Sequence, residues 1–406
     1  MFQRKVFFNL YIFFNLLFSV FFIITGKLGG DFTSSDYNTN DYILICAFIS
    51  VFFAFVLVLK ILFPTIEDIR VTPLAENKTK FLDVIILAVA LYNAYSISMG
   101  VGVNGIEKND LQVSEFFKYI YAILQPSFLV LIYLFYRCNR VNNYYYITAM
   151  LYFSCSMISG ESVNLLFLWP LLYLANRNKD KRKVKLNFIT ILVLGLIFYP
   201  LIRMSKFVIL SVFLTGDSLT LSSMSDSYMR FADGGSFFEY YISMFSASFE
   251  RFQVVANVQY LIENGTHIRN MYQYLPSDFF NEYFLTNFIY KLLTGINYSV
   301  TWLQSIVAYS INGNDSWNTH VSILGLGIVQ GISSIPAYIT MFFVFVFSIL
   351  LSKKLATNVI ELTWFLVLLL FIHGWFVSYV MFTQALVLFY IIVIVSNGFK
   401  LSAKYE

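Results

Sequence analysis

The chain has 406 residues, of which 58% are hydrophobic and only 12% are charged, and its mean hydropathy is +0.70. Soluble globular domains carry about 25% charged residues, so this composition excludes a soluble protein. The net charge of +4 says little by itself, because the distribution of Lys and Arg between loops is what sets orientation in a membrane.

Apolar runs of about 20 residues, the length needed to cross ~30 Å of hydrocarbon, recur along the whole chain. Residues 6–25 are too long for the apolar part of a signal peptide and no small-residue cleavage site follows, so the first span is expected here. The predicted fold class is an all-α polytopic integral membrane protein with about ten transmembrane helices. The expected spans are 5–25, 42–64, 82–101, 119–136, 143–160, 162–176, 187–206, 335–352, 358–380 and 383–399.

The basic residues orient this predicted bundle. With the N-terminus in the cytoplasm, 18 of the 27 Lys and Arg residues fall in inside segments, and only Lys27, Lys108 and Lys118 fall in short outer loops. The other six lie in one long segment, whose length exempts it from the rule. The basic run 176–185 lies between two expected spans, and its charge is explained as a signal that keeps this loop in the cytoplasm. We therefore expect both termini in the cytoplasm and no nucleic-acid partner.

One long interruption divides the chain into a seven-span bundle at 1–206, a periplasmic loop at 207–334 between the seventh and eighth spans, and a three-span bundle at 335–406. The loop is rich in aromatic and aliphatic residues, so it is expected to fold. Residues 236–263 lack Pro and Gly and repeat apolar residues at three- or four-residue steps. This pattern predicts an amphipathic helix that ends at Asn264 and Gly265 and lies across the outer mouth of the bundle.

Two further stretches complete the predicted loop. Residues 279–311 are partly apolar but interrupted by a Gly and an Asn, which favours interfacial helices. A hidden pair of spans there, giving eleven or twelve in all, would preserve the topology. In the segment 312–334, three glycines within seven residues permit close helix approach or a re-entrant segment: Gly325, Gly327 and Gly331.

Motifs of soluble enzymes are absent from the sequence. There is no glycine loop preceding a phosphate-binding Lys, no paired Cys and no metal-binding His pair, so no metal or cofactor is expected. The three cysteines fit small buried hydrophobic residues. What remains is Arg and His in an aromatic loop beside a membrane, which suits a lipid-linked pyrophosphate that carries a sugar.

The candidate phosphate-binding residues are arginines. Arg251 projects from the flank of the amphipathic helix, Arg203 lies at the outer end of the seventh span, and Arg230 lies at the start of the loop. Arg251 also fits a residue that contacts solvent or lipid headgroups, and Arg203 fits a snorkelling anchor.

Histidine is the candidate for acid–base chemistry because it titrates near neutral pH. His320, which heads the glycine-rich segment, is the candidate general base, with Asn318 beside it as a candidate for substrate binding. An interfacial histidine hydrogen-bonded to the loop is the alternative. His373 lies in an apolar run and favours a hydrogen bond between helices, and His267 is expected in a solvated turn.

These motifs carry a family resemblance. The chain resembles the oligosaccharide repeat-unit polymerases (Wzy) and, more distantly, the O-antigen ligases of the bacterial envelope. The resemblance rests on ten or more spans with one dominant late outer loop, on the turn 158–162, on Arg251 within the sequence Glu-Arg-Phe-Gln, and on Asn318-Thr319-His320 before a glycine-rich span. Glu161 departs from the family pattern, which commonly has Arg at this position, and Thr319 and Val321 flank the histidine where an Asn often follows it.

The resemblance implies metal-independent glycosyl transfer at the periplasmic face of the bacterial inner membrane. A growing chain on undecaprenyl pyrophosphate would be moved onto a new lipid-linked repeat unit, in O-antigen or capsule synthesis. Donor and acceptor lipids, membrane lipids and a chain-length regulator protein are the implied partners. Arginines would neutralise the leaving pyrophosphate, and His320 would activate the acceptor hydroxyl.

Two other functions stay open. A lipid-linked oligosaccharide flippase (Wzx) would have about twelve evenly spaced spans, short loops and charged residues within its spans. Another membrane polysaccharide-modifying transferase, such as an O-acetyltransferase, usually has an early histidine, and the first 266 residues contain none. The long loop and the nearly uncharged spans favour the polymerase.

Overall fold

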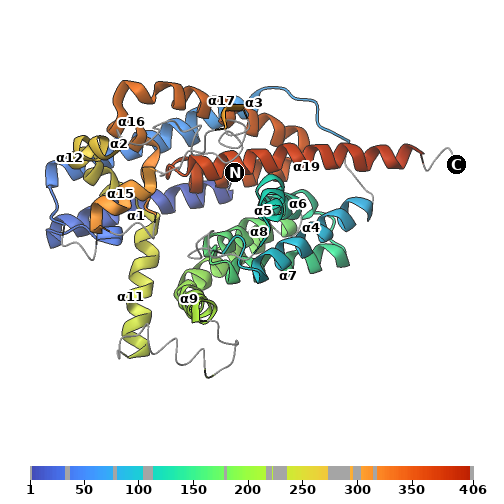
Figure 1. Cartoon of the computed structure of the whole chain (residues 1–406), viewed down its shortest axis with the longest axis horizontal. Coiled ribbons are helices and arrows are strands. Elements are labelled where there is room, and N and C mark those ends of the chain that lie inside the picture. The colour runs from blue at the N-terminus through green and yellow to red at the C-terminus, as the bar shows by residue number, and fades with distance from the viewer. Residues whose placement is uncertain are drawn as a thin grey trace. The chain divides into compact units, whose positions relative to one another are not determined.

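A computed structural model describes residues 2–32, 37–75, 80–103, 113–177, 181–215, 222, 236–272, 293–295, 303–313 and 318–402. Across these residues the protein is helical, and the one β-type pairing is an isolated bridge between Lys27 and Asn38. Figure 1 gives the order of the elements. The all-α fold expected from the sequence is confirmed for this part of the chain.

Seven of the described helices are long and apolar enough to cross a membrane: Phe2–Thr25, Asp41–Asp68, Lys80–Ser98, Phe116–Arg137, Arg182–Ile202, Ser322–Leu355 and Phe376–Gly398. Two shorter apolar helices, Leu165–Asn176 and Thr357–Phe371, match expected span 162–176 and the first part of expected span 358–380. The predicted boundary between the last two spans is wrong, because a turn at 372–375 ends the second of these helices and the last helix begins at Phe376, not near residue 383. The remaining expected span, 143–160, corresponds to the 16-residue helix α7 (Asn143–Ile158). These helices agree with a polytopic membrane protein.

The chain forms two compact units, and each combines segments that are distant in the sequence. Unit 1 contains Met1–Pro73, Phe249–Lys354 and Thr363–Gln384. Unit 2 contains Leu74–Ser248, Leu355–Leu362 and Ala385–Glu406. The division into 1–206, 207–334 and 335–406 describes order along the chain and stays a prediction.

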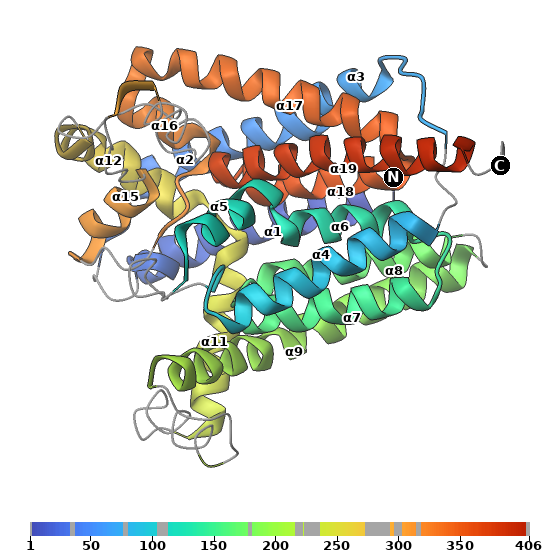
Figure 2. The same ribbon diagram turned by 45° about the vertical axis from the view of Figure 1, so that its right-hand side comes forward.

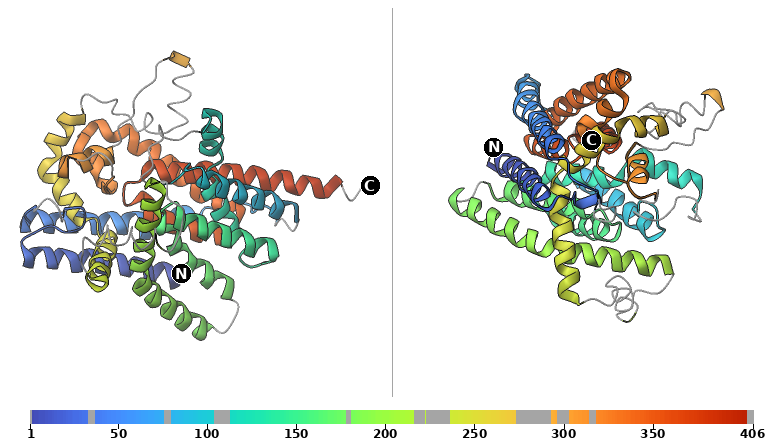
Figure 3. Two further views of the ribbon diagram at one scale, coloured as in Figure 1. Left: turned by 60° about the horizontal axis from the view of Figure 1, so that its bottom comes forward. Right: turned by 90° about the vertical axis from the view of Figure 1, so that its left-hand side faces the viewer.

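Unit 1 is built around α1 (Phe2–Thr25) and α2 (Asp41–Val56), which lie side by side (Figure 3). A π-helical turn, η2 (Leu57–Leu62), continues α2 into α3 (Phe63–Asp68). The later elements of the unit are η4 (Glu250–Phe252), α12 (Val255–Tyr272), α15 (Leu303–Asn312), α16 (Ser322–Gln330), η5 (Gly331–Ser334), α17 (Ile335–Leu355), the end of α18 (Thr357–Leu366), η6 (Val367–Phe371) and the start of α19 (Phe376–Ser402). α12 packs against both α2 and α16.

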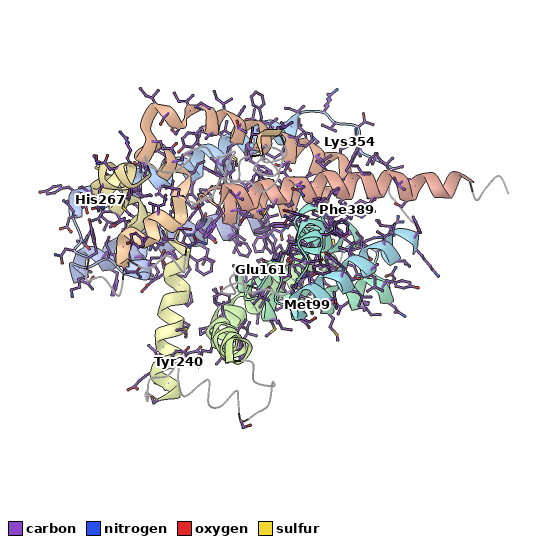
Figure 4. All side chains as sticks on the ribbon, viewed as in Figure 1. Met99, Glu161, Tyr240, His267, Lys354 and Phe389 are labelled. Carbon is purple, nitrogen blue, oxygen red and sulfur yellow. The ribbon has the colours of Figure 1, made fainter. Side chains whose placement is uncertain are left out.

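Unit 1 has two chemically different ends, marked in Figure 4 by His267 and Lys354. At the Lys354 end, Arg4 forms a salt bridge with Glu67 at 2.7 Å, and Lys353 donates to the backbone carbonyls of Glu67 and Ile69. At the other end α12, α15 and α16 meet the connection between α1 and α2. The distribution of Lys and Arg predicts that the first end lies in the cytoplasm and the second outside.

Unit 2 is a helical bundle in which α4 (Lys80–Ser98), α6 (Pro126–Arg137) and α7 run side by side (Figure 2). Its other elements are α5 (Glu115–Leu124), η3 (Ser162–Phe167), α8 (Leu168–Asn176), α9 (Lys181–Thr215) and α11 (Phe237–Phe249). The Asp83 carboxylate joins the three central helices, because it accepts from Arg137 at 2.9 Å, Tyr133 at 3.0 Å and Asn142 at 2.6 Å. A buried ion pair inside a bundle needs such additional hydrogen bonds.

The single amphipathic helix predicted over 236–263 is wrong, because the chain breaks at Gln253 and Val254. α11 begins with a capping box between Ser236 and Glu239, at the start of the predicted range. Gln253 then adopts an extended conformation and its side chain caps α12 by accepting from the Ala256 N–H at 3.0 Å. Two helices with different neighbours therefore replace the one surface helix.

The predicted stop at Asn264 and Gly265 is also wrong, since α12 continues to Tyr272 and includes His267, which is therefore not in a turn. A Cβ on Gly265 would lie 3.5 Å from the backbone oxygen of Ile328 in α16. The glycine thus permits close packing of two helices rather than ending one. Close approach also explains Gly325, whose added Cβ would lie 3.1 Å from Leu261.

Candidate functional site

The residues expected to carry chemistry converge on a short backbone pairing in unit 1. The Ser322 N–H donates to the His373 carbonyl at 3.0 Å, and the Ile323 N–H donates to the Ile372 carbonyl at 2.8 Å. These bonds satisfy amides at the start of α16, which have no partner within the helix. They join the His320 segment to the turn 372–375 between η6 and α19.

Both segments of this pairing have unusual backbones. Ser322 has a φ of +60° although it is not a glycine, and Gly374 has a φ of +81°. A Cβ on Gly374 would lie 2.6 Å from the Ser322 carbonyl oxygen, so only glycine fits here. Non-glycine residues in this conformation cluster at functional sites.

His320 is held by Trp375 of this turn. The indole Nε1 donates to the imidazole Nδ1 at 2.8 Å, and the two rings are nearly perpendicular, at 89°. An indole N–H is a donor only, so Nδ1 must offer its lone pair. The proton of the neutral His320 ring is therefore on Nε2.

His373 lies beside His320 and is buried, with 2% of its surface exposed. The ring centroids of the two histidines are 5.2 Å apart. His373 Nδ1 donates to the Leu368 carbonyl at 2.9 Å, so the expected hydrogen bond is formed within one chain segment and not between helices.

A carboxylate from the loop between α1 and α2 reaches the residue before His320. Asp31, in η1 (Gly30–Phe32), accepts from the Thr319 hydroxyl and from the Asn257 amide at 3.3 Å, both at Oδ2. Asn257 also donates to the Thr319 hydroxyl at 2.6 Å, and both Asn257 and Thr319 are buried. Three distant segments therefore fix the position of one half-buried carboxylate.

The neighbouring residue of the loop contacts η4. The Gly30 N–H donates to Glu250, and a Cβ on Gly29 would lie 3.4 Å from the same carboxylate. Asp31 and Glu250 are not among the site residues that the sequence predicts. The signal for Asp31 was the Gly29–Gly30 pair before it, since glycines permit close backbone approach.

Gln304 of α15 completes the surroundings of His320. Its Nε2 donates to the Gly374 carbonyl at 3.0 Å, and its backbone carbonyl accepts from the Thr319 N–H at 3.4 Å. The side chain is 4% exposed, yet Oε1 has no hydrogen-bond partner within the described part of the chain. A buried acceptor without a donor is costly, so this oxygen indicates a place where a bound hydroxyl or water would donate.

The structure describes the predicted site residues to different extents. Asn318, two residues before His320 in the chain, is exposed. Its Oδ1 accepts a hydrogen bond from the Ser305 hydroxyl at 2.5 Å. Arg251 lies in η4 next to Glu250, while Arg203 lies in α9 of unit 2; neither side chain is among those described. Arg230 lies outside the described residues. Unit 1 thus contains His320, Asn318 and the segment carrying Arg251.

The described side chains of the site are the carboxylates of Asp31 and Glu250 together with neutral hydrogen-bond donors and acceptors. Among the described residues no group of three or more His, Cys, Asp or Glu is placed to hold a metal ion. The side chains suit a polar, hydroxyl-rich molecule at the edge of a membrane bundle. No protein-family model, curated protein or solved structure matches this chain.

Proposed function

We propose that this protein is a polymerase of lipid-linked oligosaccharide repeat units, acting on the outer face of the bacterial inner membrane. A sugar chain on undecaprenyl pyrophosphate is transferred to a hydroxyl of a second lipid-linked unit. The new bond joins the anomeric carbon to the acceptor oxygen, and the carbon–oxygen bond to the pyrophosphate breaks. The leaving group keeps the electron pair, and arginine neutralises its charge.

The observation that supports this proposal most is the meeting of three segments at one end of unit 1. The loop carrying Asp31, the turn carrying Trp375 and the segment carrying His320 are joined there by hydrogen bonds. The same loop contacts η4, in which Arg251 lies. Polar groups so arranged beside apolar helices suit a sugar linked to a membrane lipid.

The orientation of unit 1 is the first thing to test. Cysteine is introduced at the exposed Thr266 of α12 or at the exposed Asp68 of α3, after the native cysteines are replaced. A membrane-impermeant thiol reagent should label Thr266→Cys in intact spheroplasts and should label Asp68→Cys only after permeabilisation. The reverse pattern would place the His320 end in the cytoplasm and reject an outer-face site.

The activity is tested by deleting the gene and examining the surface polysaccharide on a gel. Loss of a polymerase should leave single repeat units and no ladder, and the wild-type gene should restore the ladder. Loss of a flippase would leave no repeat units at the surface. An unchanged ladder in the deletion strain would reject both functions.

A further inference from the structure

We infer that Tyr11 of α1 is a positioning residue, whose ring holds η4 and the turn 372–375 at a fixed separation. η4 carries Arg251, and the turn holds His320. This assignment rests on the proposed function, in which these two residues act in one site. All of the segments concerned belong to unit 1.

Tyr11 lies on the buried face of α1. Phe7, Tyr11 and Asn15 are spaced by four residues, so they lie one above another on one side of the helix, and all three are buried. The Asn15 amide donates to the Tyr11 carbonyl at 2.8 Å, which joins the two turns. This face therefore presents a column of buried side chains to the later segments of unit 1.

The first contact of the Tyr11 ring is with η4. Its centroid lies 5.3 Å from that of Phe252, with an angle of 81° between the rings. Phe14 stacks on the same Phe252 ring at 5.4 Å and 21°, and the Asn15 amide donates to the Phe252 carbonyl at 3.2 Å. Phe252 follows Arg251 in the chain, so α1 fixes the backbone that carries the arginine.

The second contact of the Tyr11 ring is with His373. The two centroids are 5.5 Å apart and the rings are at 80°. His373 is also held by its bond to the Leu368 carbonyl, and its ring lies 5.2 Å from that of His320. His320 accepts from Trp375 on its other partner side chain. Tyr11 thus contacts the ring against which His320 packs.

One ring therefore makes edge-to-face contacts with two segments that are more than 100 residues apart in the chain. Such contacts are favourable only over a narrow range of geometry, and a close-packed interior transmits small displacements. Glycosyl transfer requires the acceptor oxygen and the anomeric carbon to approach to about 3–3.5 Å. A fixed separation between the segment that carries Arg251 and the segment that carries His320 would meet this requirement.

The experiment measures kcat and KM of the full chain, purified and reconstituted with lipid-linked repeat units, per mole of folded protein. Tyr11→Leu should lower kcat by about 10²-fold, the effect of a displacement of about 1 Å. KM should stay within about threefold of wild type, because binding is kept. Tyr11→Phe keeps the ring and should recover most of the lost rate.

Phe7→Leu is the matched control. Phe7 is buried on the same face of α1, and its ring contact, at 4.8 Å and 83°, is with Phe365 of α18. The substitution removes one buried ring, as Tyr11→Leu does, so both proteins should melt below wild type. Only Tyr11→Leu should lose kcat, because a general loss of stability does not change the rate of the molecules that remain folded.

Nitrogen NMR of the protein labelled at its three histidines gives a readout that does not depend on activity. The ring signals of His320, assigned with His320→Gln, should shift or broaden in Tyr11→Leu and stay unchanged in Phe7→Leu. The signals of His267, at an exposed position of α12, should be the same in all of these proteins.

Three outcomes would overturn the assignment: wild-type kcat with unchanged His320 signals in Tyr11→Leu, an equal loss of kcat in Phe7→Leu, or a Tyr11→Phe protein as slow as Tyr11→Leu. A wild-type protein that makes no polymer would instead reject the proposed function, while the NMR comparison would still test the contact. If Tyr11→Leu does not fold, Phe252→Leu removes the same contact from the other side, and wild-type kcat in that protein would overturn the assignment.

Discussion

The Asn15 side chain accepts a hydrogen bond at 3.0 Å from the backbone N–H of Val254, which lies 239 residues later in the chain. The same side chain donates to the Phe252 carbonyl at 3.2 Å, so it satisfies both sides of the break between η4 and α12. Asn15 is 1% exposed within α1. A buried asparagine in an apolar helix is thus explained by the unpaired backbone of the segment it contacts.

Substitution of Asn15 by Ala should destabilise the protein by about 1–3 kcal/mol for each backbone group left unpaired. Asn9→Ala is the control, because Asn9 is on the same helix but exposed. The apparent melting temperature in detergent measures both. Equal melting of the Asn15→Ala and wild-type proteins would contradict the role of Asn15.

The break at Val254 also shows why part of the fold could not be predicted from the sequence. Apolar runs and Lys–Arg asymmetry are local features, so they locate helices well. Residues 236–263 contain no Pro or Gly to mark a break, and the groups that stabilise the break come from α1. Periodicity within one segment carries no information about such a distant partner.

The candidate site shows the same limit. His320 stood out because histidine is rare in this chain and precedes a glycine-rich segment, both visible in the sequence. Asp31 contacts Asn257 and Thr319, which are 226 and 288 positions away, so its place beside the His320 segment depends on tertiary contacts. The preference of His320 for one tautomer likewise required the position of Trp375.

Gly374→Ala should distort the turn that holds His320. The added methyl would lie 2.6 Å from the Ser322 carbonyl oxygen, in addition to the strain of a φ of +81°. Gly26→Ala separates the two effects, because Gly26 has a φ of +70° but nothing within 4 Å of its added Cβ. Backbone strain alone should cost about 1 kcal/mol, so Gly374→Ala should melt well below Gly26→Ala and also lose activity. Equal melting temperatures would show that the turn adjusts.

Arg251→Lys should impair polymerisation although the charge is kept. A lysine ammonium lacks the planar pair of donors that matches a phosphate. By analogy with the loss of one oxyanion donor, the rate should fall about 10²–10³-fold for Arg251→Ala. Ladders of normal length and amount from a well-expressed Arg251→Ala protein would exclude Arg251 from donor binding.

The Asp83–Arg137 pair should contribute far more to stability than the Arg4–Glu67 pair. The side chains of Asp83 and Arg137 are 2% and 6% exposed. Those of Glu67 and Arg4 are 27% and 15% exposed. Asp83→Asn removes the carboxylate that Arg137 binds at 2.9 Å, and breaking a buried ion pair in this way costs about 3–5 kcal/mol. Glu67→Gln removes a partly solvated pair, whose contribution is about 0–1 kcal/mol.

Melting of the two variants in detergent compares them directly. Adding Arg137→Met to Asp83→Asn should restore part of the lost stability, because the Arg137 charge is then no longer buried. A double variant that melts below Asp83→Asn would mean that Arg137 stabilises unit 2 by packing of its side chain rather than by its charge.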